Sequence, residues 1–317
     1  MHRASIAAAL AVTALLSATA CARGGSSPQA RRTAFEDRAR AVAEAWQDAA
    51  TGDAWRTGFV PLQDFTVPPK QAFTDDLKIA FGAGWYRTQT DLTTVTPAGG
   101  VIAFPDGTTM AVPLVSARDA YTEMDKGDPP CLGSPPVQTT PIPQPSGTGK
   151  DGAVGAPAQH TCAVLTVTGA KFGTTTLRTS RGEAVVPAWL FTVAELPAPV
   201  ARVTVAATAV SPVPHPSVPP IGADQASGLA SAQRLTAVEG ARLWYTIGIG
   251  ACDTNPAGIA YETDDVVVIG GTVDPSTGGP CIDLLKLQPV SVTLTTPLGA
   301  RVVLDALSGQ PLVLGAG

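Results

Sequence analysis

The residues best suited to chemistry are the five cysteines of the 317-residue chain. Four of them, Cys131, Cys162, Cys252 and Cys281, form two local pairs that each bracket a turn-rich segment. An even set in an oxidising compartment predicts the disulfides Cys131–Cys162 and Cys252–Cys281. None has the CxxC spacing of zinc sites or of thioredoxin-like redox centres. Cys21 is then left without a partner, so a different chemistry is expected of it.

The segment before Cys21 has the three parts of a secretory signal. A short basic start is followed by an apolar run over residues 6–16, and Ala18-Thr19-Ala20 supplies small residues for a peptidase. We therefore predict a signal peptide over residues 1–20 and export of the remaining chain.

Small residues directly before a cysteine resemble a bacterial lipobox, in which the thiol is acylated and the cysteine becomes the new N-terminus. We predict that Cys21 is lipidated and that residues 21–32, which are small, polar and basic, form a flexible tether. Plain secretion with Cys21 as a free thiol stays open. Ala18 stands where a lipobox usually has Leu, and ordinary signal peptidase would cut the same bond.

Histidine, the usual general base, is nearly absent. His2 belongs to the signal, His160 lies in a Pro/Gly-rich loop and His215 in a proline-rich stretch. A Ser-His-Asp or Cys-His mechanism needs a histidine held rigidly by a third group. The sequence also contains no HExxH zinc motif, GxSxG elbow or phosphate-binding glycine loop. We therefore expect a protein that is not an enzyme and has no metal or cofactor.

Glu262, Asp264 and Asp265 form the most concentrated acidic cluster before an apolar strand. One hypothesis is a solvated turn that keeps an edge strand soluble. The rival hypothesis is a carboxylate-based hydrolase, which would need two carboxylates at a set separation, one with a raised pKa. Weak Ca²⁺ binding is disfavoured because the spaced Asp/Asn ladder of an EF-hand is missing.

Two aromatic pairs, Trp85-Tyr86 and Trp244-Tyr245, could stack on a glycan or peptide from a sheet face. Aromatic residues make up only 5% of the chain, so the core needs most of them. We expect one ring of each pair to fill the core.

Composition limits the class of partner. The net charge is −5 and there is no basic run outside the tether. A nucleic-acid partner needs a basic surface that neutralises phosphates, so this class of partner is disfavoured and we expect none. A hydrophobic content of 44% is enough for packed cores.

Periodicity predicts a mainly β (α+β) fold, with an N-terminal helix followed by two antiparallel β domains. The helix is expected over Thr33–Ala50, with Thr33 as N-cap and Glu36 completing a capping box. Asp106-Gly107 predicts a hairpin turn, and residues 116–126 a short helix. Strands are predicted at 101–104, 108–115, 163–168, 174–179, 184–193 and 200–207, and then at 234–238, 242–249, 266–273, 290–295, 301–304 and 311–314.

Residues 211–222 (SPVPHPSVPPIG) predict a Pro-rich linker, since five prolines cannot lie in a central strand. This places the helix and the first β domain in residues 33–210 and the second β domain in 223–317. Residues 176–186 and 293–303 also match at a constant shift, which raises the hypothesis of a diverged internal duplication. The alternative is two ordinary Thr/Val hairpins.

Three blocks carry a resemblance: Trp55-Arg56-Thr57-Gly58-Phe59-Val60-Pro61-Leu62, residues 179–191 (TSRGEAVVPAWLF) and residues 297–305 (PLGARVVLD). They look like secreted lipoproteins of Streptomyces-type actinobacteria. The resemblance implies location and a two-part layout, and it brings no activity. We expect a lipid-anchored protein at the outer face of the cell membrane that binds or scaffolds a protein or wall polymer. An envelope hydrolase with a carboxylate site, and plain secretion, are the alternatives.

Overall fold

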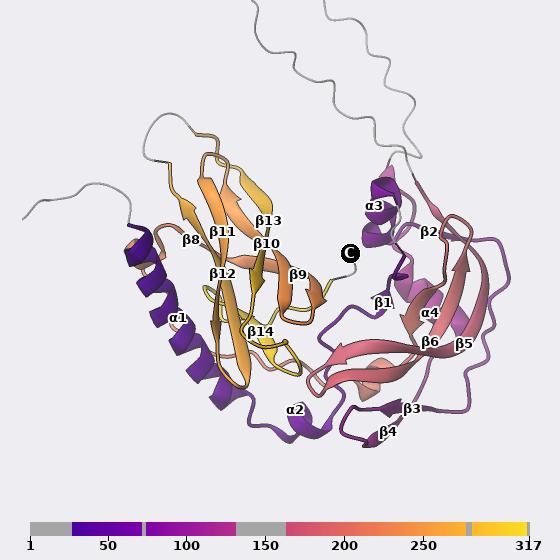
Figure 1. The fold of residues 1–317 in the computed structure, drawn as a ribbon. Helices are drawn as coiled ribbons and strands as arrows, with labels where there is room; N and C mark the ends of the chain where they lie inside the picture. The colour runs from indigo at the N-terminus through magenta and orange to yellow at the C-terminus, as the bar shows by residue number, and fades with distance from the viewer. Residues whose placement is uncertain (1–26, 72–73, 131–162, 277–280, 316–317) are drawn as a thin grey trace, which may run out of the picture.

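The computed structural model describes residues 27–71, 74–130, 163–276 and 281–315, which form two β-rich lobes (Figure 1). Strand makes up 40% of the structure and helix 21%, which confirms the mainly β class. We name residues 59–210 the first lobe, and residues 28–50 together with 223–315 the second lobe. Cys21, Cys131, Cys162 and the predicted signal peptide lie outside the described residues. No helix in the described part of the chain is long and apolar enough to span a membrane.

The first lobe is built on one seven-stranded sheet with the order β1-β7-β6-β3-β4, and with β5 and then β2 continuing from β6. The long β5–β6 hairpin dominates it, and the short helices α3 and α4 cover part of one face (Figure 1). The predicted Asp106-Gly107 hairpin is present between β3 and β4. The elements are β1 (Thr66–Val67), α3 (Asp75–Ala83), β2 (Tyr86–Thr88), β3 (Gly100–Ala103), β4 (Thr109–Val112), α4 (Ala117–Met124), β5 (Leu165–Thr179), β6 (Gly182–Val193), β7 (Val200–Val203) and the 3-10 turn η2 (Ala207–Ala209).

The second lobe contains two sheets packed face to face, with a shared core of Tyr245, Ile247, Val267 and Ile269. One sheet has the order β13-β10-β9, and the other β11-β12-β14 with β8 also on β12. Most pairs are antiparallel, but β12–β14 here and β2–β5 in the first lobe are parallel. The elements are α5 (Ala223–Ala226), β8 (Leu229–Ala230), β9 (Ala232–Glu239), β10 (Arg242–Gly250), β11 (Thr254–Glu262), β12 (Val266–Asp274), β13 (Leu285–Thr293) and β14 (Val302–Asp305).

The N-terminal helix α1 (Pro28–Ala49) covers the outer face of the β11-β12-β14 sheet. Its apolar stripe of Phe35, Val42 and Trp46 packs on Val266 and Val268 of β12. Strand β12 is therefore buried on both faces, by the other sheet and by α1. This explains why residues 266–271 are a continuous apolar run rather than an alternating one.

This packing corrects two predictions about the N-terminus. The sequence predicts the helix in one domain with the first β region, residues 33–210, but the helix belongs to the core of the second lobe, because it covers the outer face of β12. The helix also begins earlier than Thr33. Ser27 is the N-cap, accepting a hydrogen bond from Ala30 N at 3.1 Å, and Pro28 lies in the first turn. Residues 28–32 are thus helical and not part of a tether.

The Pro-rich segment 211–222 connects the lobes: Ser211 N–H donates to the Phe59 carbonyl of the first lobe at 2.8 Å, and the residues from Val213 to Pro219 contact the second lobe. Val213 and Val218 contact the α1 cluster, and Pro216 is buried. Arg38 of α1 donates to the carbonyl of Pro219 at 2.6 Å and to those of Ala306 and Leu307. The segment is an extended connection fixed by these contacts.

The matching segments 176–186 and 293–303 adopt different structures. The first forms the tip of the β5–β6 hairpin, in which Thr179 pairs with Gly182. The second leaves β13, crosses from one sheet to the other, and enters β14, which runs parallel to β12. The hypothesis of an internal duplication is therefore wrong for these segments, because two similar Thr/Val patterns serve two topologies.

Candidate functional site

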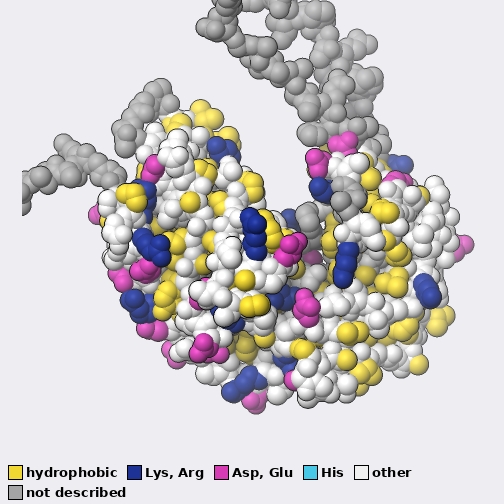
Figure 2. All heavy atoms as spheres, in the orientation of Figure 1, with side chains coloured by type: hydrophobic (Ala, Val, Ile, Leu, Met, Phe, Trp, Pro, Cys, Tyr) yellow, Lys and Arg dark blue, Asp and Glu magenta, His cyan; other side chains and the backbone are white. Residues whose placement is uncertain are grey.

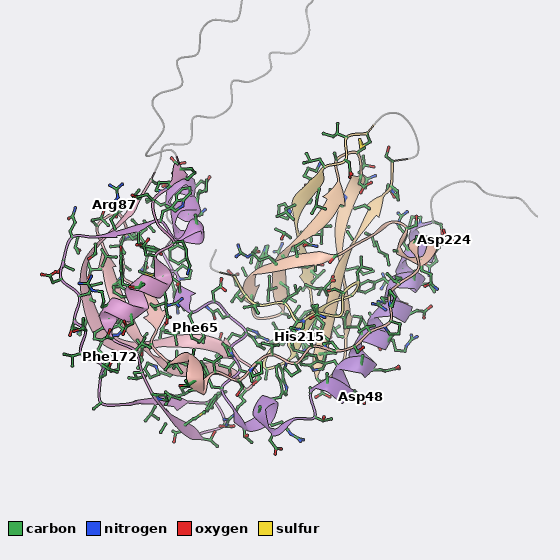
Figure 3. All side chains as sticks on the ribbon, turned by 180° about the vertical axis from the view of Figure 1, so that it is seen from behind. Asp48, Phe65, Arg87, Phe172, His215 and Asp224 are labelled. Atoms are coloured by element: carbon green, nitrogen blue, oxygen red, sulfur yellow. A yellow bond between two sulfur atoms is a disulfide. The ribbon has the colours of Figure 1, made fainter. Side chains whose placement is uncertain are left out.

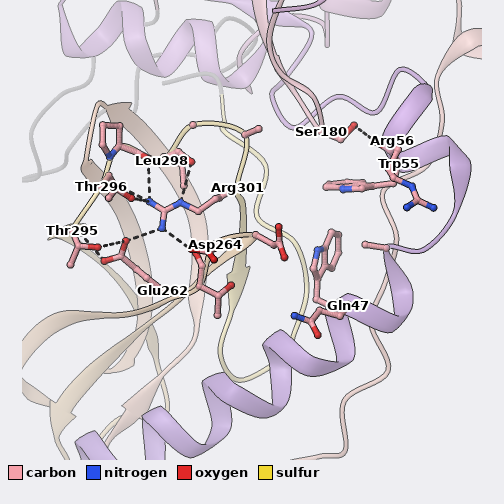
Figure 4. A pocket seen from close by; sticks show the side chains of 17 residues that line it. Gln47, Trp55, Arg56, Ser180, Glu262, Asp264, Thr295, Thr296, Leu298 and Arg301 are labelled. Carbon is pink, nitrogen blue, oxygen red and sulfur yellow. Dashed lines mark hydrogen bonds and ion pairs between the residues drawn. The ribbon is translucent and has the colours of Figure 1, made fainter. Parts of the chain in front are cut away.

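A groove of about 800 Å³ lies where the two lobes meet (Figure 4). Five separate parts of the chain line it. They are the end of α1, helix α2 (Asp53–Thr57), the β5–β6 turn at Ser180, the β11–β12 turn at 262–265 and the loop 295–301. The side chains differ in kind from wall to wall, so the groove can contact a ligand through rings and through polar groups at once.

An ion pair fixes the wall formed by the second lobe. Arg301 Nη1 donates to Glu262 Oε2 at 2.8 Å, and its Nη2 donates to the carbonyls of Thr296 and Pro297 at 2.9 and 3.1 Å. Glu262 also accepts from the Thr295 backbone N–H at 2.8 Å and the Thr295 hydroxyl at 3.1 Å. Both charged side chains are largely buried, so the network holds loop 295–301 against β11.

The same contacts set the charge of Glu262. Partial burial would raise the pKa of this carboxyl, but hydrogen bonds from Thr295 and Arg301 outweigh burial and lower the pKa below its ordinary value. Glu262 is therefore ionised at neutral pH. It acts as a hydrogen-bond acceptor that organises the wall and is poorly suited to act as a general acid.

The opposite wall is aromatic. Trp46 of α1 and Trp55 of α2 meet edge to face with ring centroids 4.9 Å apart. Trp46 is 3% exposed, whereas Trp55 is half-buried and its ring projects into the groove (Figure 4). The Ser180 hydroxyl donates to the Trp55 carbonyl at 2.8 Å, which holds α2 on the β5–β6 turn. The exposed part of Trp55 forms a flat, preorganised surface.

Exposed polar side chains complete the groove. Asp264 and Asp265 lie on the β11–β12 turn, and Gln47 and Arg56 extend from the helical side. Because Arg301 neutralises Glu262, the two aspartates give the groove a slight excess of negative charge over Arg56. The arrangement suits a ligand that offers hydroxyl or amino donors and an apolar face.

Beneath the groove, Arg178 of β5 joins the two lobes. It is 7% exposed and donates to the Gly299 carbonyl at 2.9 Å and the Arg301 carbonyl at 2.5 Å. Burial lowers the pKa of Arg178 to about 10. Backbone hydrogen bonds nearby also join the two lobes. Leu62 N–H donates to the Arg178 carbonyl, and Leu314 N–H of the second lobe donates to the Leu62 carbonyl. Arg178 thus positions loop 295–301 relative to the first lobe.

We expect Arg178→Met to lower the free energy of unfolding by about 2 kcal/mol. Two charge-assisted hydrogen bonds are lost, and relief from burying the charge offsets part of that loss. Arg178→Lys should be almost as damaging, because one ammonium cannot reproduce the planar guanidinium that reaches both carbonyls.

Urea denaturation measures this change, and amide exchange at residues 298–301 should become faster. Arg87→Met is the matched control, since the Arg87–Asp128 ion pair is half exposed and should contribute less than about 0.5 kcal/mol. Equal effects at Arg87 and Arg178 would contradict the assigned role.

The acidic cluster is only partly as predicted. Asp264 and Asp265 are exposed on a turn, as the solvated-turn hypothesis expected. Its stated reason is wrong, because β12 is a central strand bonded to β11, β14 and β8 rather than an edge strand. Glu262 differs from its neighbours, since Arg301, 39 residues away in the chain, pairs with it. In the described part of the chain no cluster of three or more His, Cys, Asp or Glu could hold a metal ion.

The aromatic pairs follow the prediction, since Tyr86 and Tyr245 are core residues with 2% and 0% exposure. The Tyr245 hydroxyl donates to the Gly270 carbonyl at 2.7 Å, and a Cβ at Gly258 would lie only 2.7 Å from that hydroxyl. Trp244 stays partly exposed on the other face of β10, under the Arg242 guanidinium.

Trp55 lies in the groove as a half-buried ring, and the sequence did not identify it as a site residue. The only sequence signal for a binding role of Trp55 is its position next to Arg56 in a chain with few aromatic residues. Of the histidines, His215 contacts Gln310 Oε1 through Nδ1 at 2.5 Å, away from the groove, and His160 lies outside the described residues.

No protein-family model, curated protein or solved structure matches this chain. Its function therefore has to be inferred from the chemistry of the groove and from the sequence.

Proposed function

We propose that this protein is a lipid-anchored binding protein of the outer membrane face, without catalytic activity, whose groove holds a glycan segment of a wall polymer. The observation that carries the proposal is the partly exposed ring of Trp55 facing a wall of carboxylate and hydroxyl groups. Sugars present C–H faces that pack on aromatic rings and hydroxyls that donate to carboxylates. The export signal, Cys21 and the resemblance to actinobacterial lipoproteins support the location.

A binding role is favoured over the envelope hydrolase by the state of the carboxylates. Glu262 is ionised and held by Arg301 and Thr295, so it lacks a proton to donate at neutral pH. Asp264 and Asp265 are exposed, whereas a general acid usually gains its proton affinity from burial. The groove, of about 800 Å³, has room for a short glycan segment.

We expect Trp55→Ala to weaken binding of soluble wall oligosaccharides about tenfold, because the stacking surface is lost. Asp264→Asn, which keeps the shape of the side chain, should weaken it about threefold by removing a charged acceptor. Both changes are measured by calorimetric titration of residues 22–317 with wall glycan fragments that carry no peptide. Cosedimentation with purified wall sacculi gives a second measurement.

Trp244→Ala is the matched control, because Trp244 is a partly exposed tryptophan outside the groove. The affinity of the Trp244→Ala variant for the glycan should equal that of the parent chain. Thermal melts identify any variant that is unfolded. Release of reducing ends from the polymer would favour the hydrolase. Binding that is indifferent to Trp55 and Asp264 would rule out the groove as the site.

The anchor is tested separately by the intact mass of the membrane-extracted protein. We expect cleavage before Cys21 and added mass from diacylglyceryl and acyl groups. A chain that begins at Cys21 with an unmodified thiol would contradict lipidation and leave export standing.

A further inference from the structure

Four large apolar side chains are exposed together near the start of β13, at the free end of the second lobe. Ile282, Leu284, Leu285 and Leu287 are 69%, 56%, 65% and 57% exposed. Figure 2 shows hydrophobic side chains gathered at this end of the lobe. We name these four residues the apolar tip. Soluble surfaces rarely gather so many large exposed aliphatic groups in so short a segment, which indicates a surface that is covered in use.

The exposure is built into the strand pairing. Leu285 lies opposite Gly250 and Leu287 opposite Gly248, so neither leucine has a cross-strand side chain to pack on. Strand β13 is also at the edge of its three-stranded sheet. Edge strands are usually protected by charges or prolines. In this segment Asp283, Lys286 and Pro289 are the only such residues, and they leave Ile282, Leu284, Leu285 and Leu287 exposed between them. The Cys252–Cys281 disulfide fixes the segment to the preceding β10–β11 connection.

The apolar tip and the N-terminal end of α1 lie at the same end of the second lobe. Arg31, in the first turns of α1, donates to Asp274 at the end of β12 at 2.6 Å. Asp274 also accepts from Asn255 at 2.8 Å, three residues after Cys252, which is bonded to Cys281 beside Ile282. Cys21 precedes Ser27 by six positions in the chain, and an extended chain of six residues reaches roughly 20 Å.

We infer that the apolar tip inserts into the acyl region of the membrane to which Cys21 is anchored, as a second contact that orients the protein. This inference rests on the proposed anchoring of Cys21. One acyl-bearing residue gives a single attachment about which the protein could rotate freely, and a second apolar contact removes that freedom. The second lobe would then stand on the bilayer beside its own N-terminus.

The test uses the mature chain with Cys21→Ser, so that binding does not depend on lipidation. Cosedimentation with neutral phosphatidylcholine vesicles, and with vesicles containing one-third phosphatidylglycerol, gives the partition constant. We expect weak binding to both, and a loss of at least about tenfold in the double variant Leu285→Ser, Leu287→Ser. The matched control is Val101→Ser, Val185→Ser, which removes two exposed aliphatic side chains from the first lobe.

Each outcome decides the inference. Three results would overturn the inference. The parent and the leucine variant could bind equally well, or the leucine variant and the valine control could lose binding equally. The third is that the parent binds neither kind of vesicle. Sedimentation velocity on the same samples detects a second copy as the alternative occupant. A dimer that the leucine variant abolishes, without vesicle binding, would replace the membrane with a subunit interface. Glycan binding by the leucine variant should equal that of the parent, which separates this test from that of the groove.

Discussion

Asp305→Ala should lower the free energy of unfolding by about 3–5 kcal/mol, the largest effect we expect of any single substitution. Asp305 ends β14 and is 1% exposed. It accepts four hydrogen bonds, from Ser231 Oγ at 2.9 Å, Ala232 N at 2.7 Å, Ser308 N at 2.8 Å and Ser308 Oγ at 2.7 Å. Alanine removes every acceptor, so the buried Ala232 N–H loses its partner and the Ser231 and Ser308 groups lose the contacts that hold them on β14.

The substitution should also affect how the second lobe is assembled. Asp305 ties the start of β9, through Ser231 and Ala232, to the turn after β14, so it fastens the two sheets together at one end. Asp305→Asn keeps the size of the side chain but presents an amide to these donors, and we expect it to lose about half as much stability as alanine does.

Urea denaturation followed by circular dichroism measures the change. Asp48→Ala is the control, because Asp48 is exposed near the end of α1 (Figure 3) and should change stability by less than about 0.5 kcal/mol. A loss below about 1 kcal/mol for Asp305→Ala would contradict its place as a structural acceptor.

Replacing both Cys252 and Cys281 by serine should lower the free energy of unfolding by roughly 3–4 kcal/mol. The disulfide has a sequence separation of 29 residues, and closing a loop of that length removes this much chain entropy from the unfolded state. The native contacts of β11 and β12 inside the loop remain, so the variant should still fold.

Denaturation of the double variant beside the parent chain gives the loss directly. Cys21→Ser serves as control, since no loop is closed by that residue in the predicted pairing. Intact mass with and without reduction adds an independent check, because each disulfide accounts for two hydrogens. Identical midpoints for the parent and the double variant would show that the bond contributes nothing to stability.

Local signals explain which elements could be predicted. The Asp106-Gly107 turn fixes its hairpin through two adjacent residues, and Ser116 caps α4 where it was expected to begin. Strand β11 was missed because Asn255, Pro256 and Gly258 read as loop residues. Pro256 in fact lies at an irregularity in the β11–β12 pairing, where a missing N–H does no harm.

The apolar stripe of α1 was also clear in the sequence, but its partner was not. Phe35 and Trp46 could have covered any apolar sheet face, and they cover one that follows some 220 residues later in the chain. Which sheet face the helix covers depends on how the two sheets of the second lobe are arranged, and no local sequence pattern contains that information. The groove has the same origin, because Trp55, Ser180, Glu262 and Arg301 converge from distant segments.

The sequence by itself therefore determined the mainly β class, the N-terminal helix and the Cys252–Cys281 pair, because each depends on residues close together in the chain or on a simple count. Only the tertiary structure decided which lobe the helix completes, that the Pro-rich segment 211–222 is packed, and that Glu262 pairs with Arg301 beside Trp55. These features depend on long-range packing, in which many weak contacts act together. A one-dimensional pattern fixes which faces must be buried, and it leaves open what buries them.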